Sequence, residues 1–353
     1  MLAQGGHPLL KKKRFAWLAL LLAFGLVAAA CGDDDSSSSD TSAGGSSSDC
    51  PADTEGDVNV SGSSTVEPIS TSVGEKLLDC SNIAATVDGP GTGDGFALFC
   101  KGETDVSDAS RPIEDTEAKT CKDAGINYVE LEIGLDGITV MTNPANDAVT
   151  CLNKGDIYAL LGPQSEGFAN WSDASALAKK VGGTDNFPDV PLDITGPGEE
   201  SGTYDAMIEL SGIEDTALSQ GVAADKAAAL RPDYQSSPND NVIIQGIEGS
   251  NSALGWVGFA YAQNAGSSVK ELQVDGGDGC VAPTYDTISD GSYPLSRSLY
   301  IYVNTAKVAA NPALKSFVDY YLSAEGIQAV NQAGYVDLPA DRLDASRATW
   351  SGV

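Results

Sequence analysis

Residues 196–203 combine glycines and hydroxyl side chains at the predicted start of a helix. They read Gly-Pro-Gly-Glu-Glu-Ser-Gly-Thr and lie between a short apolar run at 190–194 and a helical pattern at 204–210. The first backbone N–H groups of a helix have no partner inside the helix, and the helix dipole makes that end positive. The hydroxyls of Ser201 and Thr203 add two donors, so the turn has the composition of a socket for a tetrahedral oxyanion such as phosphate. Ser and Thr also begin helices simply as caps, so this turn alone does not establish a site.

Three further turns have a similar composition, and each follows a predicted strand. They read Ser-Gly-Ser-Ser-Thr at 61–65, Asp-Gly-Pro-Gly-Thr-Gly-Asp-Gly at 88–95 and Asp-Ala-Ser-Arg-Pro at 108–112. In open α/β sheets, ligands bind beyond the carboxyl ends of the strands. We therefore expect the four turns to surround one ligand.

The elements that position these turns alternate along the chain. Short β-rich runs are interspersed with helical patterns, which predicts an α/β fold in layers. From about residue 56 to Val353 the chain is long enough for two lobes. The predicted strands lie at 58–60, 83–87, 106, 128–133, 138–141, 190–194, 257–261 and 299–303, and the first helices at 68–78 and 95–101.

Together these segments resemble the phosphate-binding subunit of bacterial phosphate-specific ABC transporters, over nearly the whole mature chain. The resemblance implies a type 2 periplasmic-binding-protein fold, in which a hinge crossed twice joins two α/β lobes with phosphate held between them. We place the crossings near 138–141 and 294–301, so that lobe 1 comprises 55–138 plus 294–353 and lobe 2 comprises 139–293. The segments that carry the resemblance are the turn at 196–203, Ala-Ser-Arg-Pro-Ile at 109–113, Asp-Gly-Ile-Thr-Val at 136–140, Asp-Asn-Val-Ile-Ile-Gln-Gly at 240–246, Tyr-Pro-Leu-Ser-Arg at 293–297 and the C-terminal helices.

The same resemblance implies the residues that contact phosphate. Members of the family carry an arginine where this chain has Pro197, and an acidic residue where it has Ser110. Arg111 is therefore our candidate for the phosphate cation, because a guanidinium offers a fork of donors to two phosphate oxygens; the alternative is a surface residue or a partner of Asp108. The expected phosphate-binding residues are Ser63, Ser64, Thr65, Gly93, Asp94, Ser110, Arg111, Ser201, Gly202 and Thr203.

A carboxylate in this set suggests a basis for selectivity. Monohydrogen phosphate has a proton to donate and sulfate at neutral pH has none, so an ionised carboxylate accepts from the first and repels the second. We hypothesise that Asp94 is this selectivity residue, with Glu199 as the second candidate. The structural alternative for Asp94 is a turn or helix-capping aspartate.

The N-terminus indicates export. Four basic residues at 11–14 precede an apolar stretch at 15–30, which is typical of a secretory signal peptide rather than a spanning helix. Residues 28–31, Ala-Ala-Ala-Cys, resemble the lipobox of bacterial lipoproteins, so we expect a signal peptide at 1–30 and lipidation of Cys31; ordinary cleavage nearby is the alternative. Residues 31–54 are rich in Ser, Gly and Asp and are expected to form a flexible linker. The predicted location is the outer face of the cell membrane.

The remaining cysteines fit an oxidising compartment. Six cysteines allow 15 pairings, and we expect sequential pairing, with Cys100–Cys121 the best-supported pair. No Cys-x-x-Cys spacing occurs and the one histidine, His7, lies in the signal peptide, so we expect no metal and no cofactor. The six disulfide candidates are Cys50, Cys80, Cys100, Cys121, Cys151 and Cys280.

Composition also narrows the function. Without a histidine the mature chain has no Ser-His or Cys-His nucleophile pair, so we assign no catalytic residue and expect a binding protein rather than an enzyme. Losing the four basic residues at 11–14 lowers the formal net charge from −30 to −34, which argues against nucleic-acid binding. Screening removes most long-range repulsion of phosphate beyond about 10 Å, so local donors decide its binding.

The predicted function is a monomeric, lipid-anchored receptor that delivers inorganic phosphate to the permease of an ABC importer. Three alternatives stay open at this point. One is a binder of another oxyanion, such as sulfate or molybdate. The others are a secreted phosphohydrolase and an adhesive surface protein.

Overall fold

The computed structural model describes residues 50–51, 54–184 and 186–353. The predicted signal peptide, Cys31 and most of the predicted linker lie outside the described residues. The description concerns the compact unit Ser48–Val353. Within the described residues, no helix has the length and apolar character needed to cross a membrane.

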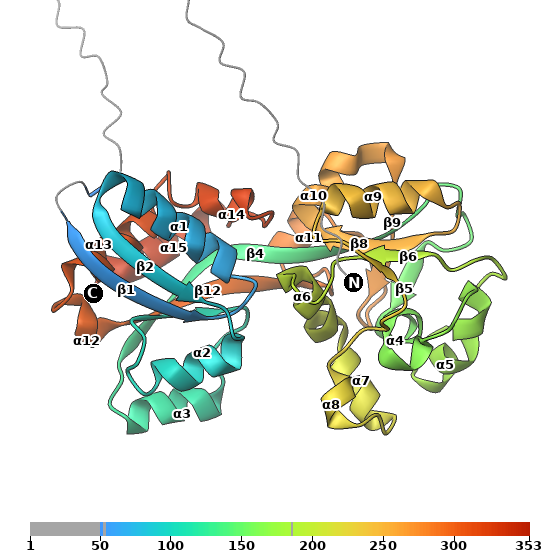
Figure 1. Cartoon of the computed structure of the whole chain (residues 1–353), viewed down its shortest axis with the longest axis horizontal. Coiled ribbons are helices and arrows are strands. Elements are labelled where there is room, and N and C mark those ends of the chain that lie inside the picture. The colour runs from blue at the N-terminus through green and yellow to red at the C-terminus, as the bar shows by residue number, and fades with distance from the viewer. Residues whose placement is uncertain (1–49, 52–53, 185) are drawn as a thin grey trace, which may run out of the picture. The chain divides into compact units, whose positions relative to one another are not determined.

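Strands and helices alternate through the first half of the chain, as Figure 1 shows. The strands there are β1 Glu55–Gly62, β2 Asn82–Asp88, β3 Val106–Ala109, β4 Tyr128–Thr142, β5 Cys151–Asn153 and β6 Ile194–Gly196. The helices are α1 Glu67–Cys80, α2 Thr92–Phe99, α3 Asp115–Asp123, α4 Lys154–Leu161, α5 Ser175–Lys180 and α6 Gly202–Ser211.

The second half continues the alternation and ends in helices. Its strands are β7 Gln235–Ser236, β8 Leu254–Gly258, β9 Lys270–Glu271, β10 Gln273–Asp275, β11 Cys280–Val281 and β12 Ser296–Asn304. Its helices are α7 Ile213–Ser219, α8 Ala224–Ala227, α9 Asp240–Gly249, α10 Phe259–Ala265, α11 Tyr285–Ser289, α12 Thr305–Val308, α13 Pro312–Tyr321, α14 Gln328–Gln332 and α15 Ala340–Trp350.

The main sheet has the strand order β2-β1-β3-β12-β4-β8-β6-β7, with β9 beside β4. β1 pairs in parallel with β2 and β3, and β6 pairs in parallel with β8 and β7, so each end of the sheet is a parallel α/β layer. The antiparallel strands β4 and β12 lie between these ends (Figure 1). This arrangement confirms the predicted α/β fold of two lobes joined by two crossing strands.

The long strand β4 corrects one sequence prediction. We expected separate strands at 128–133 and 138–141. Instead β4 is continuous, and it pairs first with β12 and then with β8. A Cβ atom on Gly134 would lie 2.8 Å from Val330 Cγ1, and one on Gly137 would lie 2.7 Å from Ile288 Cδ1. These glycines therefore allow neighbouring side chains to pack closely on the crossing strand.

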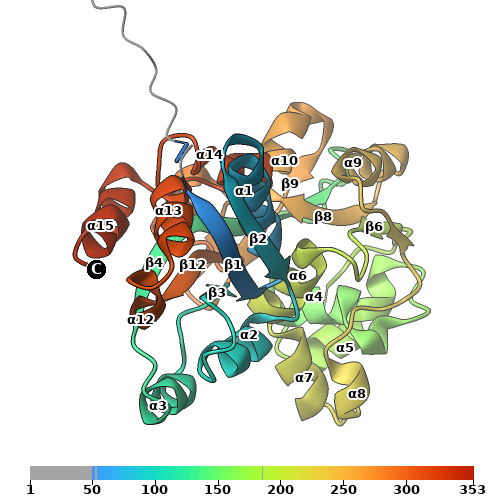
Figure 2. The same cartoon turned by 60° about the vertical axis from the view of Figure 1, so that its left-hand side comes forward.

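Helices cover both faces of the strands in lobe 1. α1, α13 and α15 lie on one side and α2 and α3 on the other (Figures 1 and 2). Aliphatic side chains of β1 and α1 pack with Phe317 of α13 in one buried cluster. In lobe 2, Trp171, Met207 and Trp256 are completely buried in another cluster. The exact limits of the two lobes stay a prediction.

Three disulfides confirm the sequential pairing. They join Cys50 to Cys80, Cys100 to Cys121 and Cys151 to Cys280. The sequence separations are 30, 21 and 129 residues. Restricting the unfolded chain by loops of this size stabilises the folded state by about 3–5 kcal/mol each in the chain-entropy model.

Candidate functional site

The first predicted anion loop lies between β1 and α1 and is fixed to the end of β3. The backbone N–H of Ser63 donates to the carbonyl of Asp108 at 2.9 Å, and the N–H of Thr65 donates to Ser63 Oγ at 3.2 Å. Gly62 makes this contact possible, because a Cβ there would lie 2.0 Å from the Asp108 carbonyl oxygen. Ser63 and Thr65 are buried, so their hydroxyls lie at the base of the loop rather than in solvent.

The second and third loops contact each other. Thr92, at the start of α2, places its Oγ1 atom 3.1 Å from Ser110 Oγ and accepts the Ser110 backbone N–H at 3.2 Å. The N–H of Gly91 donates to the Gly62 carbonyl at 2.8 Å, which ties the second loop to the first. The three loops of lobe 1 therefore form one hydrogen-bonded wall. Sequence reasoning did not single out Thr92.

The turn at 196–203 faces this wall from lobe 2. Ser201 is the N-cap of α6, and its Oγ accepts the Thr203 backbone N–H at 3.2 Å. A Cβ atom on Gly202 would lie only 3.0 Å from the Cα of Thr65. The two predicted anion loops thus lie against one another.

One cavity is lined by residues of both lobes. Lobe 1 contributes Ser63, Ser64, Thr65, Thr92 and Ser110, and α6 contributes Asp205, Ile208 and Glu209. A second cavity, which shares Ser64 with the first, is lined by Ser201, Gly202 and Thr203. The structure therefore brings eight of the ten predicted residues to adjoining cavities once Arg111, described below, is included. The other two, Gly93 and Asp94, are exposed in the first turn of α2.

Arg111 is already paired with acidic side chains of its own lobe. Its two terminal nitrogens donate to the two carboxylate oxygens of Glu117, each at 2.8 Å, and Glu114 lies 3.7 Å away. Burial alone would raise the pKa of Glu117, but the hydrogen bonds from Arg111 and from the Glu114 backbone N–H, together with the positive charge of Arg111, outweigh burial and lower that pKa. Arg111 also lies 5.8 Å from the centre of the Phe96 ring. Its partners are therefore Glu117 and Glu114, not the Asp108 weighed from the sequence.

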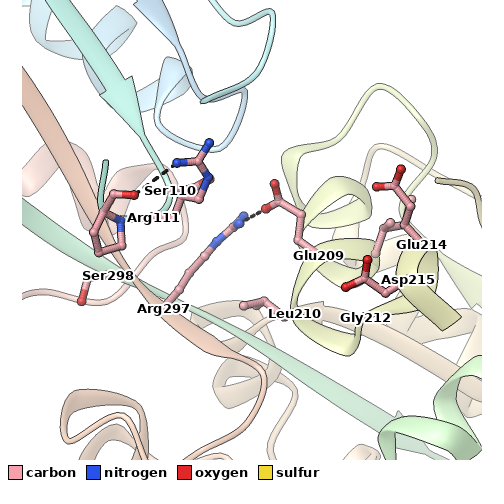
Figure 3. A pocket seen from close by; sticks show the side chains of 11 residues that line it. Ser110, Arg111, Glu209, Leu210, Gly212, Glu214, Asp215, Arg297 and Ser298 are labelled. Atoms are coloured by element: carbon pink, nitrogen blue, oxygen red, sulfur yellow. Dashed lines mark hydrogen bonds and ion pairs between the residues drawn. The ribbon is translucent and has the colours of Figure 1, made fainter. Parts of the chain in front are cut away.

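A second arginine, Arg297, lies deeper in the cleft. It belongs to β12, opposite Asp136 of β4 in the crossing strands. Its Nε donates to Asp136 Oδ2 at 3.2 Å and its Nη2 donates to Thr65 Oγ1 at 2.9 Å. Its Nη1 pairs with Glu209 of α6, and Figure 3 shows these two side chains pointing toward each other.

The environment of Arg297 keeps it charged. Burial alone would lower its pKa, but the negative charges of Asp136 and Glu209 outweigh that effect and raise it. From the sequence, Arg297 was only part of the segment 293–297 that carries the family resemblance, and no role was expected for it. Its approach to Thr65 depends on the pairing of strands far apart in the chain, which local patterns do not reveal.

Two acidic residues of α6 also face lobe 1. Asp205 Oδ2 accepts the Ser64 hydroxyl at 2.8 Å, and burial raises the pKa of Asp205 above its usual value. Asp205 and Glu209 are four residues apart, so they lie on one face of the helix. That spacing, directly after Ser-Gly-Thr, was the available sequence signal for both. Within the described residues, no group of three or more His, Cys, Asp or Glu side chains is arranged to hold a metal ion.

Comparison with known proteins identifies the family. Residues 39–325 match the model of the PBP superfamily domain. A protein named SphX from Synechocystis sp. is 36% identical over 309 residues, which cover 85% of this chain and 84% of the relative. The phosphate-binding protein PstS of Staphylococcus saprophyticus is 33% identical over 288 residues, or 81% of each chain. The chain belongs to the PstS family of phosphate-binding proteins within this superfamily.

Solved structures agree with the family and the fold. The crystal structure of a possible phosphate-binding protein from Planctomyces limnophilus has a TM-score of 0.75 and 34% sequence identity, and the match covers 85% of this chain and 99% of the other. An ABC-type phosphate transport receptor from Vibrio cholerae has a TM-score of 0.57 at 23% identity and supports the fold alone. The resemblance and the type 2 fold expected from the sequence are confirmed.

Proposed function

We propose that this protein binds inorganic phosphate between its two lobes and delivers it to the permease of an ABC importer. The observation that carries this proposal is the meeting of two donor-rich walls. The loop at 63–65 lies against Gly202 at the start of α6, and both walls contribute hydroxyl-bearing residues to the lining of adjoining cavities. Related proteins named for phosphate binding support the choice of anion.

The expected ligand set remains that of the sequence prediction. Hydroxyls and backbone N–H groups come from Ser63, Ser64, Thr65 and Ser110 in lobe 1, and Ser201, Gly202 and Thr203 face them from lobe 2. Gly93 and Asp94 complete the predicted set from the first turn of α2. Phosphate would be held mainly by neutral donors, because Pro197 leaves lobe 2 without its usual arginine.

The positive charge must then come from lobe 1. The sequence nominates Arg111, and the structure adds Arg297, which contacts Thr65 directly. Closure of the lobes on phosphate by a hinge motion of β4 and β12 would present the closed form to the permease.

Selectivity for phosphate requires a carboxylate at the cleft. Asp94 and Glu199, the two sequence candidates, are exposed. Asp205 is better placed, because it lines the cavity with Ser63 and Ser110 and accepts only the Ser64 hydroxyl among the hydrogen bonds described for it. Its second oxygen can accept the proton of monohydrogen phosphate, whereas it would repel sulfate.

We place the protein outside the cytoplasm, anchored through a lipidated Cys31 and functioning as a monomer. The basic and apolar N-terminus, the polar linker and the three disulfides support export. We propose a receptor rather than an enzyme, since the mature chain has no histidine to activate a nucleophile.

Titration calorimetry with single anions tests the proposal. Phosphate-stripped protein should bind phosphate with a stoichiometry of one, and sulfate and molybdate should bind much more weakly. Tight binding of sulfate or molybdate without phosphate binding would contradict the choice of anion. Hydrolysis of a phosphate ester would contradict the assignment as a receptor.

A further inference from the structure

We propose that Arg297 supplies the positive charge for bound phosphate, and that Glu209 is an internal anion that competes with phosphate for this guanidinium. The inference rests on the proposed function and adds to it a residue that sets affinity. It starts from the position of Arg297 in the crossing strands, where one side chain contacts both lobes.

Each of the three guanidinium nitrogens of Arg297 has a different partner. Asp136, opposite it in β4, holds Nε, while Nη2 donates to Thr65 of lobe 1 and Nη1 pairs with Glu209 of lobe 2. Thr65 Oγ1, which accepts from Arg297, also donates a long hydrogen bond of 3.5 Å to the Gly202 carbonyl, so Arg297 reaches the point where the two walls meet. An anion bound at Thr65 would therefore lie beside the guanidinium.

The charges around Arg297 do not favour a further anion as they stand. Asp136 and Glu209 both pair with it, and Asp205 lies on the same face of α6 as Glu209. Two carboxylates already neutralise one guanidinium more than fully. Monohydrogen phosphate would bring two further negative charges to the same place, so one carboxylate has to withdraw when phosphate binds.

Glu209 is the carboxylate that can withdraw. Its side chain is 53% exposed, whereas that of Asp136 is only 3% exposed. Removing Glu209 from Arg297 returns its charge to water, while separating Asp136 would leave a charge stranded in the interior. Ion pairs with an exposed partner contribute little to stability, so phosphate can replace Glu209 at small cost.

Phosphate cannot displace the carboxylate partner of Arg111 as readily. Glu117 contacts it through both oxygens, and one of those oxygens also accepts the backbone N–H of Glu114 at 2.9 Å. The Glu117 side chain is 18% exposed. Its geometry is fixed by its own helix, so it has less freedom than Glu209 to release its arginine.

The substitution Glu209→Gln tests the competition. It keeps the size of the side chain and removes the charge, so phosphate should bind roughly threefold to tenfold more tightly in calorimetry on the whole protein. Asp215→Asn is the matched control, because Asp215 lines the same cavity as Arg297 and Glu209 (Figure 3), is not among the residues that line the cavity of Ser63 and Ser110, and makes the same change in net charge. It should change the affinity less than twofold.

A second background tests the role of Arg297. In Arg297→Gln/Asp136→Asn the buried pair is replaced by two amides, so neither partner is left as an unpaired charge. Phosphate should bind at least tenfold more weakly there, and adding Glu209→Gln should give no gain. Thermal unfolding of each variant checks that it folds.

Three results would overturn the inference. They are unchanged or weaker binding by Glu209→Gln, an equal gain from Asp215→Asn, and retention of affinity by the double variant. In each case the wild-type protein still binds phosphate, so the proposed function survives. Absence of phosphate binding by the wild type would instead contradict the proposed function itself.

Discussion

Arg111 and Arg297 both line the cavity beside Glu209, yet they are held in different ways. Arg111 is 35% exposed and pairs with Glu117 of a neighbouring helix, within six residues of sequence. Arg297 is 10% exposed and contacts residues 161 and 232 positions away. One arginine belongs to a local surface pair, and the other joins the crossing strands to both walls of the cleft.

The difference in burial and pairing determines which of the two arginines can bind an anion strongly. An exposed arginine with a bidentate carboxylate gains little from a further anion, because its charge is already screened and satisfied. A guanidinium in a partly dry cleft acts over a shorter and less screened distance. Its partners therefore control both the stability of the hinge region and the strength with which an anion is held.

Removing the buried arginine should produce the largest effect. Arg297→Gln leaves Asp136 buried without its ion-pair partner, which we expect to lower the free energy of unfolding by about 3–5 kcal/mol. Urea unfolding measures this change. Adding Asp136→Asn should recover part of the loss, since no uncompensated charge then remains. A single variant as stable as the wild type would mean that the two arginines do not differ in structural role.

Asp108 shows what a buried carboxylate does without an arginine. It lies at the end of β3, with Oδ1 accepting the Ser70 hydroxyl at 3.0 Å, and that hydroxyl lies 3.2 Å from the Tyr321 hydroxyl. Its Oδ2 has no hydrogen-bond partner among the described residues. Burial raises the pKa of Asp108 to about 7, with a smaller contribution from Glu67, while the Ser70 hydrogen bond opposes the rise.

This shift predicts a loss of stability as pH rises. The folded state keeps the Asp108 proton between its usual pKa of 3.8 and about 7, whereas the unfolded chain loses it. The contribution is therefore complete below about pH 4 and is lost by about pH 7, at most about 4 kcal/mol in total. Asp108→Asn should remove this dependence, so its stability relative to wild type should rise over that range in denaturant titrations. Parallel curves for the two proteins would contradict the prediction.

A measurement of anion selectivity tests whether Asp205 of α6 faces the ligand. Asp205→Asn should reduce the preference for phosphate over sulfate by about tenfold, because the amide can donate to sulfate where the carboxylate repels it. Competition calorimetry with both anions measures the ratio. Asp94→Asn serves as the comparison, since the sequence nominated Asp94. A larger change in the phosphate-to-sulfate ratio for Asp94→Asn would show that Asp94, at the start of α2, is the selectivity residue.

Much of this arrangement could be predicted from local sequence. The turns at 61–65 and 196–203 have the right composition, and strand-helix alternation places them at one edge of each sheet. In the structure Gly202 of the second turn lies against Thr65 of the first. The sequential disulfide pairing was expected from cysteine order in an exported chain.

The partners of the two arginines could not be predicted from the turn patterns. Arg111 was chosen because it adjoins Ser110 in a turn that follows a strand. The helix that carries Glu117 returns to neutralise it, and no turn pattern indicates that return. Arg297 reaches Thr65 only because β12 lies between β3 and β4 in the sheet. The continuous strand β4 was also not predicted, because two shorter strands were expected there.

The smallest effect should come from the exposed arginine. Arg111→Gln removes a pair whose partners are 35% and 18% exposed, so we expect a stability loss of less than about 1 kcal/mol. Phosphate affinity should change less than twofold, because both terminal nitrogens of the Arg111 guanidinium already donate to Glu117 and the guanidinium lies beside the Phe96 ring. Calorimetry on Arg111→Gln and on Arg297→Gln/Asp136→Asn under the same conditions compares the contributions of the two arginines to phosphate affinity. A loss of tenfold or more in Arg111→Gln would restore the sequence assignment, and it would require Glu117 to release Arg111 when phosphate binds.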